Sequence, residues 1–446
     1  MKKFIQTIQN IIRIEDLRNK LIATLGLILI YRFGAHVVIP GVDPLKLSGM
    51  EEQAANGIVG MINMFSGGAF ANASVFALGI MPYISASIVI QLLGMAIPYF
   101  QRLQREGESG RNKINQITRY LTVAITLFQA PAYLTNLRSQ IPADAFAMQG
   151  QLFWFSSVII MIAGTMFIMW LGEKITDRGI GNGISLIIMI GIIARLPQSL
   201  AAELTSRISV GGGGLITFLI EMVILFLIFI ATIALVQAVR RVPVQYAKRV
   251  VGNKQYGGQR QYIPLKVNAA GVMPIIFAQA LMFIPMMFVG FDTETTSAIA
   301  AAFADFTGFW YNFVFGLLVV IFTYFYTAIT VNPTQMADDM KKNGGFIPGI
   351  KPGRKTAEHL DSIMSRITFP GSVFLALVAI LPAFAMIAGV NNQFAQFYGG
   401  TSLLILVGVV LDTLQQIESH LLMRRYDGLM KSGRIKGKGG ASSMSM

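Results

Sequence analysis

Long apolar runs alternate with short polar segments along almost the whole chain. Each run is close to the ~20 residues that a helix needs to cross the hydrocarbon core of a bilayer. Because backbone groups inside lipid must be hydrogen-bonded within their own element, this pattern predicts a single bundle of transmembrane helices. Ten spans are expected, at residues 21–38, 74–98, 118–137, 152–171, 183–200, 215–239, 269–289, 309–331, 370–388 and 401–423. Arg195 and Pro197 interrupt the fifth of these runs.

The distribution of lysine and arginine predicts the orientation of these spans. If the N-terminus is cytoplasmic, 31 of the 36 basic residues fall on the inner segments and only Lys46, Arg138, Arg195 and Arg207 fall outside. Basic residues concentrate on the cytoplasmic side of membrane proteins. Both termini are therefore expected in the cytoplasm, with an amphipathic N-terminal segment at residues 1–20 lying on the membrane surface and a basic tail at 424–446.

Composition agrees with a membrane protein, because 54% of the residues are hydrophobic and only 13% are charged. The absence of cysteine excludes disulfides and thiolate metal sites, and the three histidines show no metal-binding spacing. The net charge of +14 could indicate a nucleic-acid ligand. In a membrane protein it is more typical of cytoplasmic loops that face anionic lipids.

The stretch at residues 57–70 is apolar and rich in glycine, but it is too short to span. One interpretation is a helix lying in the membrane interface. The other is a short helix folded back into the membrane, which is tolerated only where protein or a cavity surrounds it.

Two inner segments are much longer than a turn requires. Residues 240–266 carry seven basic residues and no acid, and their alternation around a glycine pair predicts a β-hairpin-like arm. Residues 332–369 predict a helix, a glycine–proline turn and a second helix. Both could be basic arms that face lipid. Their length and turns favour docking arms for a large and partly acidic partner, such as the RNA surface of a ribosome.

The expected spans contain no residue pattern that is typical of a catalytic site. The glycines of RGIGNGIS lack the strand and the Gly-Lys-Ser/Thr of a phosphate loop. Arg32 and Glu221 lie near span ends, where they are expected to reach water, and Asp412 is interpreted as a residue that pairs helices. A secondary transporter or lipid flippase is the alternative hypothesis, and a membrane-embedded enzyme is a third.

Several long blocks resemble the SecY family, the channel-forming subunits of the bacterial Sec protein translocase. They follow the family order over nearly the whole chain: MFSGGAFANASVFALGIMPYISASIVIQLL, EGESGRNKINQITRY, MWLGEKITDRGIGNGIS, YAKR, IPLKVNAAGVMP, GGFIPGIKPG and YGGTSLLILVGVVLD.

The resemblance implies an all-α fold of ten helices in two inverted halves of five, at residues 21–200 and 201–423, around an hourglass pore. Such a channel would pass unfolded secretory polypeptides and release apolar segments sideways into lipid. The implied pore ring is Ile80, Ile84, Ile184, Ile188, Ile276 and Ile405. The implied plug, which blocks the resting pore, includes Met61, Asn63, Met64, Phe65, Ser66, Gly67 and Gly68.

The resemblance also implies a lateral gate made by the second, third, seventh and eighth spans, with Ser87, Gln129 and Asn268 as its polar residues. Partner docking would use Lys248, Arg249, Lys254, Lys351 and Arg354. The implied partners are SecE-like and SecG-like small subunits, a SecA-like motor ATPase, the ribosome with its RNA, signal peptides with nascent chains, and anionic lipids. No cofactor and no enzymatic activity are expected, and the membrane would be the bacterial cytoplasmic membrane.

Two departures from the family pattern affect the docking arms. Lys351 stands where the family usually has arginine, so the charge is kept but the planar, bidentate donor is lost. Asn253 and Lys254 stand where relatives often carry two arginines.

Overall fold

The computed structural model describes residues 14–47, 60, 63–147, 150–209, 213–246, 249–251, 254–256, 260–288 and 307–432. Each of the ten expected spans overlaps one helix of this part of the chain. These helices are α2 (Glu15–Gly34), α5 (Met81–Ala96), α7 (Glu108–Gln140), α8 (Gln151–Arg178), α9 (Gly183–Ile208), α10 (Gly214–Gln237), α11 (Met273–Phe288), α13 (Phe309–Thr330), α15 (Arg354–Ile387) and α17 (Gly400–Ser432).

Fewer helices pass a test of length and hydropathy for membrane spans than overlap the ten expected spans. Within the described residues, six helical stretches are long and apolar enough to cross a membrane. A seventh arises if α5 and the short α6 (Pro98–Arg105), which meet at a bend of 102°, form one broken span. The observed helices are therefore consistent with ten spans.

Three helix boundaries differ from the expected ones. The second span was expected from residue 74, but residues 75–80 form turns and α5 begins at Met81, with proline in its first turn. The polar segment before the third span is helical, because α7 starts at Glu108 directly after Gly107. The expected interruption of the fifth span is wrong, since α9 continues through Arg195 and Pro197 as far as Ile208.

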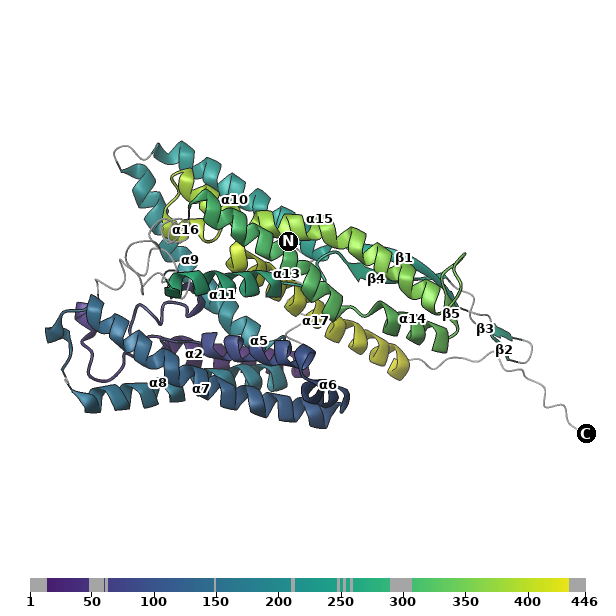
Figure 1. The fold of residues 1–446 in the computed structure, drawn as a ribbon, viewed down its shortest axis with the longest axis horizontal. Coiled ribbons are helices and arrows are strands. Elements are labelled where there is room, and N and C mark those ends of the chain that lie inside the picture. The colour runs from purple at the N-terminus through teal and green to yellow at the C-terminus, as the bar shows by residue number, and fades with distance from the viewer. Residues whose placement is uncertain are drawn as a thin grey trace, which may run out of the picture.

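The helices form two groups that meet along α9 (Figure 1). On one side, α5 packs on α7, α7 packs on α8, and α2 also lies against α8. On the other side, α13 packs against both α11 and α15. Helix α9 contacts α8 of the first group and both α10 and α17 of the second. The largest apolar core lies at this junction, where α2, α8, α9 and α17 contribute buried side chains.

Glycine allows α8 and α9 to approach closely where they begin to diverge. A Cβ on Gly183 would collide with the backbone oxygen of Gly172, and a Cβ on Gly172 would lie 2.9 Å from Cγ1 of Ile184. Neither glycine has a positive φ, so the requirement here is space and not backbone conformation. The close packing of these two helices therefore requires residues without a side chain at positions 172 and 183.

We expect Gly183→Ala to lower the thermal unfolding temperature of the purified protein in detergent. The added methyl group meets backbone that cannot move aside, and overpacking of this kind costs about 1–3 kcal/mol. Gly26→Ala in α2 is the control, because nothing lies within 4 Å of its Cβ position. Alanine there should be neutral or stabilising, since it favours a helix interior by ~1 kcal/mol over glycine. Equal unfolding temperatures for the two variants would contradict the packing argument.

The two expected arms are present, and they pair with each other. The first arm is a hairpin of β1 (Val239–Tyr246) and β4 (Arg260–Lys266), with β2 (Arg249–Val251) and β3 (Lys254–Tyr256) paired beyond it. The second arm contains α14 (Pro333–Lys342), β5 (Gly345–Phe346) and the start of α15. Strand β5 adds to β1, so one antiparallel sheet of order β4-β1-β5 joins the arms.

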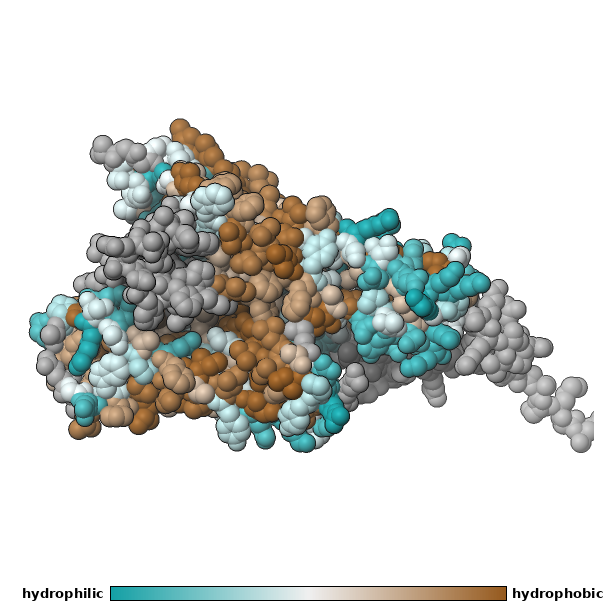
Figure 2. Space-filling model, in the orientation of Figure 1, coloured by the Kyte–Doolittle hydropathy of each residue, from teal (hydrophilic) through white to brown (hydrophobic). Residues whose placement is uncertain are grey.

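The joined arms have an apolar core of their own. Val242, Val244 and Leu265 of the sheet pack against Met340, Ile347, Leu360 and Met364 of the second arm. Figure 2 shows a broad hydrophobic band over the helices and a hydrophilic surface over the arms. The arms are therefore a folded unit that projects from the apolar part of the molecule, as the sequence predicted.

Short connections at the opposite end also pack against one another. The 3₁₀ turn η1 (Pro44–Lys46) lies beside η2 (Ala143–Ala145), and the Lys46 ammonium pairs with the Asp144 carboxylate at 2.7 Å. The hydrogen bond from Lys46 holds the pKa of the Asp144 carboxyl below its usual value and raises the pKa of Lys46. Both groups are exposed, so this pair contributes little to stability.

Candidate functional site

Five of the six isoleucines assigned to the pore ring surround one cavity. The cavity has a volume of about 480 Å³, and Ile84, Ile184, Ile188, Ile276 and Ile405 are among its lining residues. They come from α5, α9, α11 and α17, so both helix groups contribute. Ile80 precedes α5 and is only 2% exposed within the central core. The structure therefore brings the ring residues together at the junction of the two groups.

The spacing of these isoleucines explains why they share a face. Ile80 and Ile84 are four residues apart, as are Ile184 and Ile188, and side chains at this spacing lie one above the other on a helix. Branched apolar side chains around a constriction offer no hydrogen bond to a polar solute. Such a constriction can close by dewetting when it is empty.

The described part of the expected plug is compact and folds back on itself. Residues 63–65 are helical, and a series of turns follows. The Asn63 side-chain oxygen accepts a hydrogen bond from the Ala71 amide at 3.0 Å, and the Ser66 hydroxyl accepts one from the Phe70 amide at 3.1 Å. Gly67 and Gly68 have φ angles of +64° and +94°, which favour glycine. Met61 lies outside the described residues.

Three side chains from two helices hold the backbone of this segment, and we call them the plug clasp. Tyr31 of α2 donates to the Ser66 oxygen at 3.2 Å, and Arg32 donates to the Gly67 oxygen at 2.9 Å. Tyr133 of α7 donates to the Phe70 oxygen at 2.8 Å. The Arg32 side chain is half-buried, so its bond to this segment leaves the expectation that it reaches water as a prediction.

Helix α9 closes the other side of the plug. A Cβ on Gly67 would lie 2.8 Å from the Cα of Gly191, so the two backbones touch. Gly68 is equally close to the guanidinium of Arg195, which stands 2.8 Å from its Cβ position. Ile184 and Ile188 of α9 therefore face the cavity. Gly191 and Arg195, one to two turns further along the helix, contact the plug.

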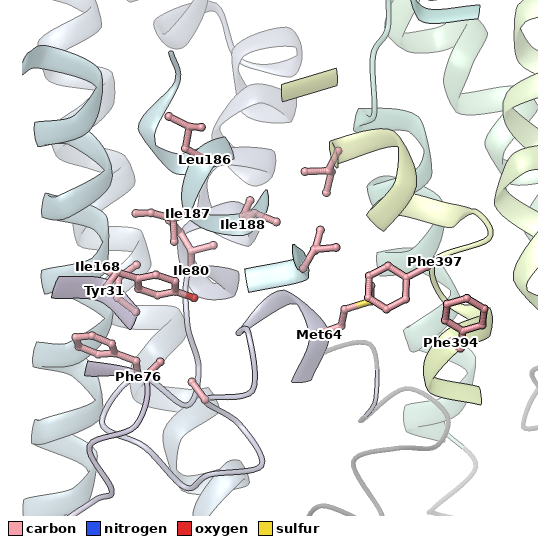
Figure 3. Packing of buried hydrophobic residues seen from close by; sticks show 14 of the residues in the cluster. Tyr31, Met64, Phe76, Ile80, Ile168, Leu186, Ile187, Ile188, Phe394 and Phe397 are labelled. Atoms are coloured by element: carbon pink, nitrogen blue, oxygen red, sulfur yellow. The ribbon is translucent and has the colours of Figure 1, made fainter. Parts of the chain in front are cut away.

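The tip of the plug rests against the second helix group. Figure 3 shows Met64 pointing toward the ring of Phe397, with the buried isoleucines of α9 nearby. Two small cavities border this contact, of about 30 and 20 Å³, and Met64 lines both. Each has room for only about one water molecule. The described part of the plug therefore lies close against the second helix group at Met64.

The seam between α5 and α13 is polar and contains residues that sequence reasoning did not assign. Tyr326 of α13 donates to Gln91 Oε1 of α5 at 3.3 Å, and the Gln91 amide donates to Ser87 at 3.3 Å. This contact joins the two helix groups through side chains. The polar character of Gln91 was visible in the sequence, but no pattern could pair it with a tyrosine 235 residues away.

The three predicted gate residues have different surroundings. Ser87 lines the large cavity. Asn268 is 9% exposed, and its side-chain oxygen has no hydrogen-bond partner within the described structure. Gln129 is half-buried on α7 and is not among the residues that line the cavity. The structure therefore links Ser87 to the seam, and the assignment of Gln129 and Asn268 to the gate stays a prediction.

A buried ionic cluster lies at the far end of α9. Arg207 pairs with Glu203 at 2.8 Å and with Glu221 of α10, and it also donates to the Gly389 oxygen at 2.7 Å. Glu203 is fully buried and accepts from the Asn391 amide at 2.8 Å. The expectation that Glu221 reaches water is wrong, because this carboxylate is 7% exposed and ion-paired.

This ionic cluster supports the short helix α16 (Asn392–Ala395), which stands next to the plug. Asn391 caps α16, and Phe394 packs in the same core as Phe397. The Tyr398 hydroxyl donates to the backbone oxygen of Glu221 at 3.0 Å. Burial raises the pKa of Tyr398, which further favours the protonated hydroxyl that donates this bond.

Asp412 also differs from its predicted role. Its side chain lines the large cavity and is exposed, and it makes no hydrogen bond to another helix within the part of the chain that the structure describes. It accepts one hydrogen bond, from Gln416 on its own helix at 3.2 Å. The sequence shows that an acidic residue lies within an apolar run. It does not show whether that face of the helix contacts protein or a cavity.

The predicted docking residues lie on the arms as far as the structure describes them. Lys351 is exposed in the turn between β5 and α15, and its backbone oxygen accepts a bond from Thr356 at 3.0 Å. Arg354 has a side chain 92% exposed and pairs with Glu358 at 3.0 Å. Arg249 and Lys254 belong to β2 and β3. Lys248 lies outside the described residues.

Comparison with known proteins relates the chain to one family. The profile of the SecY family matches residues 74–414. The protein translocase subunit SecY of Streptomyces coelicolor is 46% identical over 433 residues, which cover 93% of this chain and 97% of that protein. The subunit of the same name from Mycobacterium tuberculosis (strain ATCC 25618 / H37Rv) is 42% identical over 439 residues, covering 94% and 98%.

Solved structures share the fold at lower identity. One described as a protein-conducting channel has a TM-score of 0.59 and 18% identity, over 94% of this chain and 95% of that one. Sec61 in a canine ribosome–channel complex has a TM-score of 0.55 and 18% identity, with the same coverage.

Proposed function

The chain belongs to the SecY family of protein translocase subunits, and we propose that its isoleucine ring and plug form the seal of a protein-conducting channel. The function of the family is to pass polypeptides across a membrane. A channel of this kind must admit an extended chain of any sequence and yet remain tight to ions when it is empty. The following features of the chain support these assignments.

The convergence of isoleucines from four helices on one cavity carries the proposal. An apolar ring can close around a passing chain without binding any particular side chain, and it dewets when the chain leaves. The packed plug adds a second barrier on the other side of the ring. A transporter for a small polar solute would be expected to bind it through charged or polar side chains, whereas the residues assigned to the ring are all isoleucines.

The seam between α5 and α13 is the proposed exit toward lipid. Its hydrogen bond between Tyr326 and Gln91 is a single neutral contact, and such a bond contributes about 0.5–1.5 kcal/mol. An apolar segment that enters the cavity can replace this contact with burial against lipid. We therefore include Tyr326 and Gln91 with Ser87 among the gate residues, and we retain Gln129 and Asn268 as proposed members.

The joined arms are the proposed docking site for a motor ATPase or a ribosome. Lys351 and Arg354 are exposed on them, and Lys248, Arg249 and Lys254 belong to the tip of the first arm by sequence. The channel itself supplies no energy in this scheme, so the partner or the membrane potential must drive the chain. SecE-like and SecG-like subunits, signal peptides and anionic lipids complete the proposed set of partners.

The proposed location is the cytoplasmic membrane of a bacterium, with both termini and both arms on the cytoplasmic side. The asymmetry of lysine and arginine supports this orientation. It puts the cavity on the cytoplasmic side of the ring and the plug on the outer side.

The pore assignment is tested by crosslinking to a stalled secretory chain. The sequence contains no cysteine, so one cysteine at Ile84, Ile188 or Ile276 provides a unique thiol opposite a single cysteine in the stalled cargo. We expect disulfides from these positions and none from Leu227, a 58% exposed residue on the apolar surface of α10. Absence of disulfides, with the cargo shown to be engaged, would exclude a pore at this ring.

A further inference from the structure

Asp412 lies in the wall of the large cavity, beyond the ring. On α17, Ile405, Gly408, Val409 and Asp412 all line this cavity. Their spacing of three, four and seven residues puts them on one face of the helix. Seven residues at 1.5 Å each place Asp412 about 10 Å from Ile405 along the axis. The plug contacts are at the other end, where Gly400 and Thr401 share a small cavity with Met64.

Asp412 is the one charged residue among those that line the cavity in the described structure. Its polar neighbours in the wall are neutral: Ser87, Gln91, Asn182 and Ser185. The remaining wall is mostly aliphatic, and apolar walls concentrate the field of a single charge into the open space. This negative charge is unusual in a chain of net charge +14 whose inner segments are basic.

The carboxylate is held in place from the other helix group. The Gly181 amide donates to Gln416 Oε1 at 2.8 Å, which fixes the orientation of that amide group. Gln416 Nε2 consequently faces Asp412 and donates to Oδ2 at 3.2 Å. Within the described residues, Oδ1 has no donor and no cation pairs with Asp412. The side chain is thus oriented, exposed to the cavity and able to accept a charged donor.

We propose that Asp412 binds the basic leading segment of an entering polypeptide through an ion pair with its lysine or arginine side chains. This inference rests on the proposed channel function. Secretory signals begin with a positively charged segment ahead of an apolar one. An ammonium or guanidinium at Asp412 would hold that segment at the cavity wall while the apolar part lies at the isoleucine ring, two helical turns away.

The expected gain in the translocation rate of a basic cargo is modest, because the Asp412 side chain is exposed. Exposed ion pairs shift an equilibrium by roughly two- to fivefold. An effect of this size is enough to favour one cargo over another when both compete for a single channel. Asp412 would therefore influence the selection of cargo without being required for its passage.

The test uses the full chain in its native membrane, supplied with its motor, and one secretory cargo in three versions. The versions differ only in a basic, a neutral or an acidic leading segment, and the initial rate of protease protection is measured. Asp412→Asn should slow the basic cargo roughly two- to fivefold and leave the neutral cargo unchanged. Asp412→Lys should reverse the order, so that the acidic cargo becomes faster than the basic one.

Glu418→Gln is the matched control, because Glu418 is an exposed carboxylate on the same helix and is not among the cavity residues. We expect it to leave the order of the three cargoes unchanged. Equal slowing of all three cargoes by both Asp412 variants, or no slowing at all, would overturn the proposal. The crosslinking test at the isoleucine ring is repeated in the Asp412→Asn variant. If the ring still crosslinks to the stalled cargo, the channel assignment holds and only the role of Asp412 is overturned.

Discussion

Glycine in place of Ile84, Ile184, Ile188 and Ile276 is expected to make the resting channel leak ions and small solutes. Each substitution removes a branched apolar side chain from the constriction, so the opening becomes wider and easier for water to fill. A loss of only about 1.4 kcal/mol in the barrier raises a flux roughly tenfold. Efflux of a small fluorescent solute from vesicles that contain the purified protein measures the change.

Valine at the same four positions is the matched control for the ring, because it keeps a branched apolar side chain with one methylene fewer. We expect vesicles with the valine variant to remain nearly as tight as those with the unmodified protein. Leu227→Gly, on the exposed face of α10, controls for a general effect of glycine on a helix. If the glycine ring is as tight as the original, the seal lies elsewhere.

Loss of the plug clasp is expected to release the plug from its position under the ring. Arg32→Met keeps much of the side-chain length but leaves the Gly67 oxygen without its donor, and an unsatisfied buried group costs about 1–3 kcal/mol. Such a change shifts the population of the displaced plug by roughly five- to 150-fold. Tyr133→Phe removes a donor from a different carbonyl, that of Phe70, and should act in the same direction.

A single cysteine at Met64 reports the position of the plug, because this side chain is only 7% exposed where the plug lies in this structure. We expect an impermeant thiol reagent added from the outer side to label it faster in both clasp variants. Arg32→Lys, whose ammonium can still donate to the Gly67 oxygen, should label more slowly than Arg32→Met. Equal labelling rates in all variants, with normal folding, would show that other contacts retain the plug.

The apolar runs were sufficient to locate the membrane helices, but they could not identify what each face of a helix meets. Apolar length sets where a helix crosses lipid, so every expected span overlaps an observed helix. Glu221 and Asp412 are both isolated acids in apolar runs, yet one is buried against Arg207 and the other faces a cavity. That difference depends on the neighbouring helix, which the local sequence does not contain.

The sequence also did not predict the contacts between distant segments. The hairpin of the first arm has local turn signals, but its pairing with β5 joins residues about 100 positions apart. Pro197 suggested a break, although α9 remains helical because its neighbours on both sides support it. The isoleucine ring is a special case: the residues read as ordinary packing positions, and only the family resemblance distinguished them.

The contacts that join the two helix groups at the ends of α9 are stronger than the contact that joins them between α5 and α13. At one end Arg207 and Glu203 bind Glu221 and residues 389–391, and at the other end Gly181 bonds to Gln416. Removing one partner from a buried ion pair costs about 3–5 kcal/mol. The seam at Gln91 and Tyr326 depends on a neutral bond of about 1 kcal/mol. We therefore expect the two helix groups to separate at the contact between α5 and α13, while the attachments of α9 keep the groups joined at its two ends.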